Sequence, residues 1–159
     1  LKAGADKVSI NTAAILNEKL ISSSSERFGS QCIVAAVDVK RNNNSWSVYS
    51  HGGTKNTGLE AFEWMTKLEK LGAGEILLTS MDKDGTKSGF DLDLLKKATN
   101  RLNIPVIASG GVGSLEHFKE GVIIGGASAL LAASVFHFAE YSISEVKQYL
   151  FDNNVEVRR

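Results

Sequence analysis

Three stretches of this chain share one frame, and that repeat constrains the fold more than any other feature of the sequence. Each stretch begins with Gly-Ala, continues with a short strand-like segment and ends in a hydroxyl side chain; they are residues 4–12, 72–80 and 126–134. Gly-Ala is typical of the end of a helix, and the segment after it is typical of a buried strand. One unit therefore recurs along the chain, which indicates successive βα units.

The rest of the chain also alternates between strand-like and helix-like segments. This alternation favours an α/β fold with a parallel sheet, and units that bring small polar groups to one rim favour a TIM (β/α)8 barrel. Strands are expected near residues 7, 33, 75, 106 and 129, and helices at 17–28, 59–71, 92–102, 115–124 and 144–150, with residues 1–6 as the tail of a further helix whose C-cap is near Gly4. A closed barrel has eight strands. We therefore expect residues 1–159 to form a single partial barrel domain of strands four to eight, with the N-terminal three βα units and the natural N-terminus missing.

The composition narrows the functional classes. The 159 residues are 43% hydrophobic, enough for one core, and 18 basic residues balance 18 acidic ones. A net charge of zero gives no basic surface for nucleic acid or an anionic membrane, so neither partner is expected. Cys32 is the single cysteine, and neither a membrane helix nor a signal peptide is visible. A reducing compartment, the cytoplasm, is the expected location.

The segment 76–91 has the composition of a functional loop. An apolar run, Ile76–Leu78, passes into a polar stretch that contains Gly85 and Gly89. Ligands of βα proteins bind at the carboxyl ends of the strands, and this stretch exceeds the roughly 2 to 6 residues that a simple connection needs. We interpret it as a buried strand followed by a ligand-binding loop; an ordinary long surface loop is the alternative.

Asp38 is the candidate for acid–base chemistry, since it follows an apolar run, residues 33–37, at the end of an expected strand. A carboxylate there costs free energy unless it is paired or used, and a partly desolvated carboxylate suits general acid or base catalysis. The alternative is an aspartate that caps a loop or pairs with Lys40 or Arg41. The sequence supports both interpretations equally.

Glycines and small polar residues follow other expected strands. Gly110 and Gly111 lie between a strand and a helix, where backbone N–H groups can approach a phosphate, although a tight turn would use the same residues. Their spacing does not match the dinucleotide fingerprint. Ser134 ends the next strand, and adjacent loops after the last two strands commonly form the phosphate site of a barrel. Asn11 and Thr12 are a similar polar pair, so two phosphate sites are expected.

No metal site or cofactor is expected from the sequence. His51, His117 and His137 are scattered, without a paired cysteine or a close acidic residue, so they do not form a metal-binding pattern. His117 and His137 are interpreted as structural residues. Trp46 and Trp64 are interpreted as packing residues rather than as a platform for stacked bases.

Five motifs together resemble a known family. They are ADKVSINTA at 5–13, VDVKR at 37–41, LLTSMDKDGTKSG at 77–89, ASGG at 108–111 and AASVFH at 132–137. In combination they resemble the cyclase subunit of imidazole glycerol phosphate synthase, of histidine biosynthesis, over essentially the whole chain. The resemblance implies a TIM barrel. It also implies that ammonia from a partner glutaminase subunit, in a heterodimer, converts a bis-phosphorylated ribulosyl aminoimidazole carboxamide substrate to imidazole glycerol phosphate and aminoimidazole carboxamide ribotide.

The resemblance further implies roles for individual residues. Two aspartates perform acid–base catalysis in that family, and Asp38 matches the one on strand five, whereas the one on strand one has no counterpart here. Lys7 and Glu75 look like members of the charged ring through which ammonia enters. The residues implied in substrate binding are Asn11 and Thr12 at one phosphate, Gly85, Gly110, Gly111, Ala133 and Ser134 at the other, and Thr79, Asp84 and Ser109 between them.

Two other functions remain open. The sister phosphoribosyl isomerase of the same pathway has a similar central loop, but Lys40-Arg41 and the expected hairpin around Trp46 fit the cyclase better. The second alternative is non-enzymatic, a half-barrel assembly module whose open sheet edges pair with a partner or with another copy. The chain alone is expected to lack cyclase activity, because one catalytic carboxylate and closure of the sheet are absent from its pattern.

Overall fold

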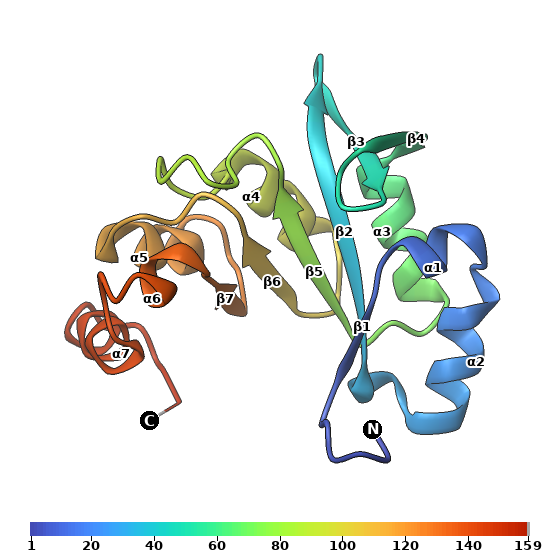
Figure 1. Cartoon of the computed structure of the whole chain (residues 1–159), viewed down its shortest axis with the longest axis horizontal. Helices are drawn as coiled ribbons and strands as arrows, with labels where there is room; N and C mark the ends of the chain where they lie inside the picture. Colours follow the sequence, from blue (N-terminus) through green and yellow to red (C-terminus); the bar gives the residue numbers. More distant parts are fainter. Residues whose placement is uncertain (159) are drawn as a thin grey trace.

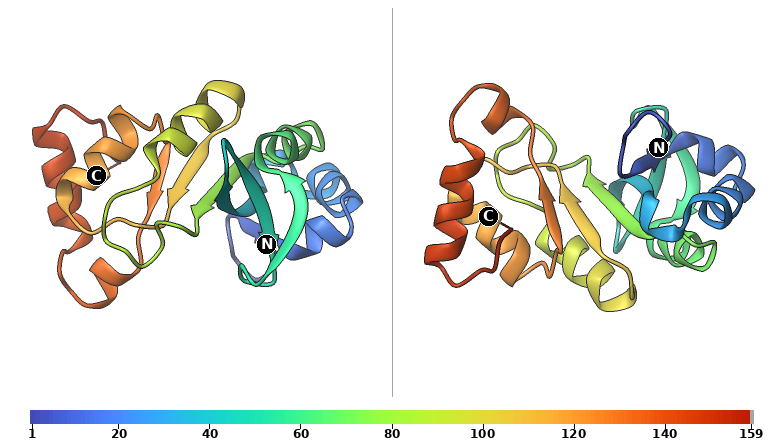
Figure 2. Two further views of the ribbon diagram at one scale, coloured as in Figure 1. Left: turned by 90° about the horizontal axis from the view of Figure 1, so that it is seen from above. Right: turned by 90° about the horizontal axis from the view of Figure 1, so that it is seen from below.

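The computed structural model describes residues 1–158, and its centre is a curved sheet of seven strands. Five strands are parallel and lie side by side in chain order (Figure 1): β1 (Val8–Ile10), β2 (Ile33–Asn42), β5 (Glu75–Ser80), β6 (Val106–Ser109) and β7 (Ala129–Leu131). Figure 2 shows the N-terminal and C-terminal units at opposite ends of this sheet. The α/β fold, the parallel pairing and the partial barrel of about five βα units are confirmed.

A hairpin adds the two antiparallel strands. β3 (Ser45–Ser50) pairs with the second half of β2, and β4 (Lys55–Glu60) pairs with β3. The alternating pattern correctly predicts β3, but only one face of the strand is open, since Trp46 is 1% exposed. β4 lies where the sequence predicts a loop and the start of a helix. Four of its six residues, Lys55, Asn56, Gly58 and Glu60, are of types depleted in strands, so backbone pairing to β3 determines its conformation.

Helices separate the parallel strands. Five of them occur where the periodicity predicts helices: α2 (Lys19–Phe28), α3 (Ala61–Lys70), α4 (Leu92–Arg101), α5 (Leu115–Ile123) and α7 (Ile143–Asp152). Three short ones were not predicted, because they are too short to show a period: α1 (Thr12–Leu16), α6 (Ser134–His137) and the 3-10 turn η1 (Ser30–Cys32). Residues 1–6, expected to be a helix tail, contain no helix; they include a turn in which the Gly4 N–H donates to the Leu1 carbonyl.

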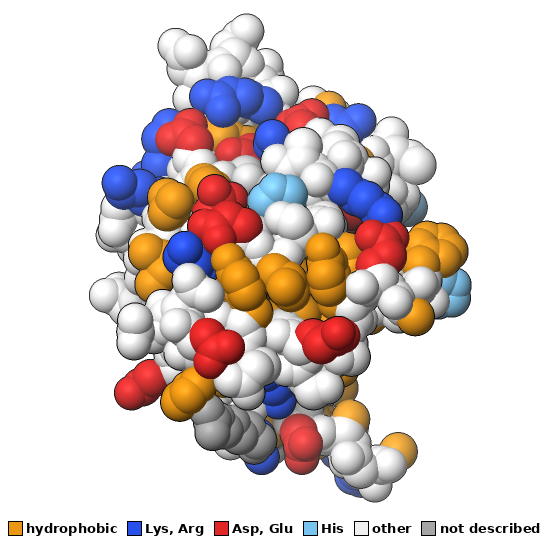
Figure 3. All heavy atoms as spheres, turned by 90° about the vertical axis from the view of Figure 1, so that its left-hand side faces the viewer, with side chains coloured by type: hydrophobic (Ala, Val, Ile, Leu, Met, Phe, Trp, Pro, Cys, Tyr) orange, Lys and Arg blue, Asp and Glu red, His pale blue; other side chains and the backbone are white. Residues whose placement is uncertain are grey.

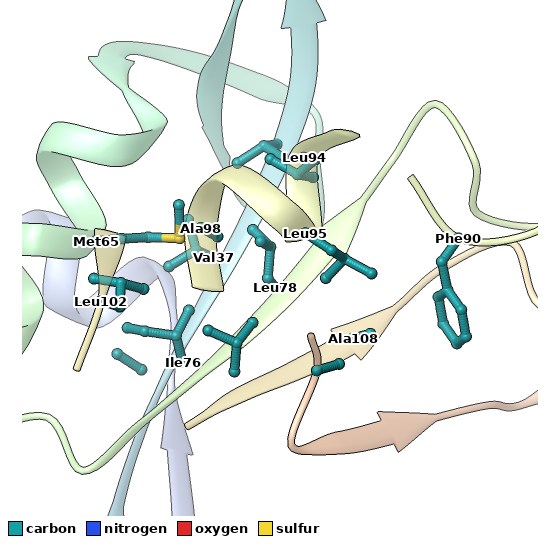
Figure 4. Packing of buried hydrophobic residues seen from close by; sticks show 14 of the residues in the cluster. Val37, Met65, Ile76, Leu78, Phe90, Leu94, Leu95, Ala98, Leu102 and Ala108 are labelled. Atoms are coloured by element: carbon teal, nitrogen blue, oxygen red, sulfur yellow. The ribbon is translucent and has the colours of Figure 1, made fainter. Parts of the chain in front are cut away.

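The two faces of the sheet have different environments. Val37, Ile76, Leu78 and Ala108 are buried against the helices together with Leu94 and other apolar residues (Figure 4). The alternate residues of the same strands are partly exposed, among them Asp38, Thr79 and Ser109. Successive side chains of a strand point to opposite faces, so this second face is the one that a complete barrel encloses. Within residues 1–158, no helix is both long and apolar enough to cross a membrane.

Candidate active site

The carboxyl ends of the parallel strands place several polar side chains in one row. Asp38 is in register with Thr79, and Thr79 is in register with Ser109. Registered residues of parallel strands lie on the same face, and the neighbours of each of these residues along its strand are buried on the helix side. The row therefore lies on the partly exposed inner face, at the rim where barrel enzymes bind their substrates.

Among the described residues, the Asp38 side chain is hydrogen-bonded to one other side chain, that of Asn11. The Asn11 amide nitrogen donates to Asp38 Oδ2 over 2.9 Å, which joins the end of β1 to the end of the part of β2 that pairs with the parallel strand β5. The two cations suggested as alternative partners contact other groups: the Lys40 ammonium lies 5.3 Å from the centre of the Tyr49 ring, and Arg41 pairs with Asp93. The Asp38 carboxylate is thus held by an amide rather than neutralised by its cationic neighbours, and its second oxygen is available for another donor.

Asn11 and Thr12 begin the β1–α1 turn beside Asp38. Asn11 Oδ1 is buried and has no hydrogen-bond partner among the described residues. Thr12 Oγ1 accepts from the backbone N–H of His51 over 2.9 Å, so the tip of the β3–β4 hairpin lies against this turn. An unpartnered buried acceptor is uncommon in proteins, and Asn11 Oδ1 is therefore free to accept a hydrogen bond from a ligand or a water molecule.

A cavity of about 140 Å³ occupies the other end of the rim. Three loops surround it, those that follow β5, β6 and β7. Its lining includes seven residues that the sequence analysis connects with substrate or phosphate binding: Asp84, Gly85, Ser109, Gly110, Gly111, Ala133 and Ser134. It also includes Lys87, Val112, Leu131 and Ala132. Residues from 84 to 134 in the sequence thus form one small cavity that has both polar and apolar walls.

The glycines of this cavity are required by the packing of two loops. Gly110 and Gly111 have φ of +93° and +99°, a region that favours glycine. A Cβ on Gly111 would lie 2.3 Å from the Gly89 carbonyl oxygen, and one on Gly110 would lie 2.6 Å from the Ser80 carbonyl oxygen. The Gly89 N–H also donates to the Gly111 carbonyl over 2.8 Å. The β5–α4 loop therefore lies directly on the β6–α5 turn, and side chains there would separate them.

Both ends of the β5–α4 loop are held by β2, β3 and α4. Near its start, Asp82 accepts the Arg41 backbone N–H over 2.6 Å. At its end, Asp91 caps α4 by accepting the Leu94 N–H over 3.1 Å, and it accepts the Trp46 indole N–H over 3.2 Å. Neither Asp82 nor Asp91 is predicted as a loop anchor by the motifs of the sequence. An aspartate directly before a helix is the local signal for Asp91.

Lys7 and Glu75 lie at the opposite, N-terminal ends of their strands. Their side chains form an ion pair that spans β2, because Glu75 opens β5 and Lys7 directly precedes β1. The pair is therefore separated from Asp38 by the length of the strands. Residues 1–158 contain no cluster of three or more His, Cys, Asp or Glu side chains arranged for a metal ion.

The fold and the rim define an enzyme-type (β/α) barrel, with a strand-end carboxylate next to a glycine-lined cavity. More specifically, the chain belongs to the histidine biosynthesis protein family, whose model matches residues 1–142. This family consists of TIM-barrel enzymes and includes both the isomerase and the cyclase of histidine biosynthesis. The predicted barrel and the predicted pathway are confirmed, and the family match applies equally to the two enzymes.

Proposed function

We propose that this chain carries the substrate-binding and acid–base residues of the cyclase subunit of imidazole glycerol phosphate synthase. The observation that supports this most strongly is the order of groups along the rim. Asn11 and Thr12 lie at β1, Asp38 and Thr79 follow on β2 and β5, and the glycine-lined cavity lies at β5 to β7. A substrate with a phosphate at each end would span this row, with its reacting centre near Asp38.

Such a binding mode explains how the site would promote the reaction. Binding energy from the two phosphates holds the substrate in an extended conformation, so the reacting centre is positioned without a further loss of entropy. Asp38 then donates or accepts a proton there, and Asn11 fixes the orientation of the carboxylate. Thr79 and Ser109 offer hydroxyl groups to the middle of the substrate from the same face.

The same proposal assigns ammonia delivery to the opposite end of the sheet. The Lys7–Glu75 ion pair would belong to a charged entrance, and a glutaminase subunit bound below it would supply ammonia. A passage enclosed by strands and shielded from water would keep ammonia unprotonated on its way to the rim. The cytoplasm, where biosynthetic enzymes meet their small-molecule substrates, is the proposed location.

The hairpin favours the cyclase over the sister isomerase. β2 extends past Asp38 through Lys40 and Arg41, and both cations are used in the hairpin: Lys40 lies over Tyr49, and Arg41 lies 4.7 Å from the centre of the Trp46 ring. This is the region in which the sequence resembles the cyclase more closely. The isomerase of the same family is the second candidate, since it too acts on a substrate with two phosphates.

We propose that the chain by itself does not turn over the substrate. Five parallel strands leave both β1 and β7 with one paired edge each among the described residues, and the inner face is partly exposed to water. Three further βα units with a second aspartate would close the barrel and complete the acid–base pair. In the non-catalytic alternative, the same open edges would serve only for assembly.

A chimera tests the assignment. It joins the first three βα units of a complete family cyclase to this chain, and it is assayed with ammonia and the bis-phosphorylated substrate. Ring formation supports the cyclase, and bare isomerisation supports the sister enzyme. In an active chimera, Asp38→Asn should lower kcat by about 10²- to 10⁴-fold, the usual contribution of a general acid or base.

Two controls accompany the chimera. Asp93→Asn, an exposed carboxylate on α4, should leave kcat unchanged. The unfused chain is assayed in the same way to measure turnover without a closed barrel. A rate comparable to that of the chimera would contradict the proposed need for further βα units. A folded chimera with neither activity would favour the assembly module.

A further inference from the structure

Lys87 gives the phosphate cavity a charge that neither the sequence motifs nor the glycine pattern identified. Among the described residues that line the cavity, it is the only cation, and Asp84 is the only acidic residue. A cavity with one carboxylate and no counter-charge would repel a phosphate. The charge balance of the cavity therefore depends on the position of the Lys87 ammonium.

The backbone of Lys87 is held in an uncommon conformation. Its φ is +55°, which a side chain with a Cβ adopts rarely outside turns. The neighbouring β6–α5 loop lies directly against it, since a Cβ on Gly113 would come within 2.5 Å of the Lys87 Cβ. Strained residues that persist because the surrounding structure holds them are concentrated at functional sites. Here the residue with this conformation is a lysine that lines the cavity.

The Lys87 ammonium is paired with Glu140, which lies beyond the cavity. Glu140 follows α6, and its backbone N–H donates to the Val135 carbonyl over 2.9 Å. The two side chains remain 44% and 35% exposed, so water screens their attraction. The pair joins the β5–α4 loop, which lines the cavity, to the segment after α6, which lies outside the lining.

We infer that Lys87 is the counter-ion of the phosphate bound in this cavity and that Glu140 competes with the phosphate for it. In the empty site the ammonium pairs with Glu140. When a phosphate enters, the flexible stem of Lys87 lets the ammonium turn toward the more highly charged group. Lys87 is thus a binding residue, and Glu140 acts through it. This inference rests on the proposed function, because that function makes the cavity a phosphate site.

The competition predicts opposite effects for the two partners. The full chain is titrated with inorganic phosphate while the backbone amides of Gly85, Gly111 and Ser134 are followed by NMR. Lys87→Met should weaken phosphate binding roughly five- to tenfold, the range expected for a partly screened charge-assisted contact. Glu140→Gln should tighten it about two- to fivefold by removing the competitor. The double variant should bind like Lys87→Met, since Glu140 acts only through the lysine.

A lysine in the same loop provides the matched control. Lys83 carries the same charge but donates to Ser88 Oγ over 3.4 Å and does not line the cavity. Lys83→Met should leave phosphate binding within about twofold of the wild type. Equal losses in Lys83→Met and Lys87→Met would indicate a general effect of net charge and would overturn the inference. Circular dichroism confirms that each variant is folded.

The remaining outcomes separate this inference from the proposed function. One outcome is that phosphate shifts the three amide signals while neither Lys87→Met nor Glu140→Gln changes the phosphate affinity. In that case the cavity binds anions, but the inference that Lys87 is the counter-ion is wrong. Tighter binding in Lys87→Met would also refute it. If phosphate shifts none of these amides in the wild type, this inference fails, whereas turnover of the chimera still decides the proposed function independently.

Discussion

At the scale of single residues, the rim depends on groups whose neighbours come from distant parts of the sequence. Asp38 meets Asn11, which is 27 residues away, and Gly111 meets Gly89. The rim residues could be predicted from the sequence, because polar residues and glycines follow the apolar strands. Their hydrogen-bond partners could not be predicted, because bonds between strand ends depend on strand order and register. Lys87 was missed for the same reason, as one lysine in a polar loop carries no local signal.

Gly111 provides a direct test of loop packing. Gly111→Ala places a Cβ at a positive φ and against the Gly89 carbonyl, so it should destabilise the fold by roughly 1–3 kcal/mol in urea unfolding. Gly52→Ala is the matched control: Gly52 also has a positive φ, +62°, but a Cβ there meets nothing within 4 Å. If both variants lose the same stability, backbone strain alone is responsible and the proposed contact between the loops is unimportant.

At the scale of elements, the β5–α4 loop is fixed by its neighbours. Asp91 caps α4 and accepts the indole N–H of Trp46, so one carboxylate joins the hairpin, the loop and the helix. The helices themselves were predicted because each has a long apolar face. β4, α1 and α6 were not predicted, because they are too short to show a period of their own. β4 depends on its pairing with β3.

Replacing Asp91 should therefore affect more than one element. Asp91→Ala removes the cap of α4 and leaves a buried indole donor unpaired, so we expect a loss of about 2 kcal/mol in urea unfolding. Asp93→Ala removes only exposed ion pairs with Arg41 and Lys97 and should cost at most about 1 kcal/mol. Similar losses for the two variants would argue against Asp91 as the anchor of this loop.

Helix α7 should show a defined pH dependence. Hydrogen bonds from the Ser142 side chain and backbone lower the pKa of Glu145 from its ordinary value of 4.5. A lowered carboxyl pKa stabilises the folded state above the pKa of the unfolded chain, and this contribution is lost as the pH falls through the folded-state pKa. Acid should therefore loosen the first turn of α7 through this group.

NMR titration of Glu145 checks this dependence. Ser142→Ala should raise the pKa of Glu145 toward 4.5 and reduce the acid sensitivity of the α7 amides. Gln148→Ala is the control. Gln148 is on the same helix and donates to Asp152, so its replacement should leave the pKa of Glu145 unchanged. An unaltered pKa in Ser142→Ala would show that the capping box does not form in solution.

At the scale of the whole molecule, the open inner face and the C-terminal side expose apolar surface. Figure 3 shows a band of hydrophobic side chains on the face formed by the C-terminal elements. Leu131 at the β7 edge and Ile143 at the start of α7 are 41% and 60% exposed. A groove of about 410 Å³ lies between α5, β7 and α7. Exposed strand edges next to apolar surface favour association.

The chain should self-associate as its concentration rises, and sedimentation velocity would detect this. Leu131→Lys places a charge at the β7 edge and should shift the equilibrium toward the monomer by about tenfold or more. Leu16→Lys, on α1, changes a residue that is 76% exposed and should have little effect. If the wild type remains monomeric at high concentration, the open edges do not drive assembly.

The sequence alone determined the repeated βα unit, the five parallel strands and the types of residue at the rim, because these depend on local periodicity and on where apolar runs end. The tertiary structure decided which of those residues meet. Asp38 is joined to Asn11, three separate loops form one cavity, and Lys87 is brought to it, because strand register and loop packing arise only when distant segments come together.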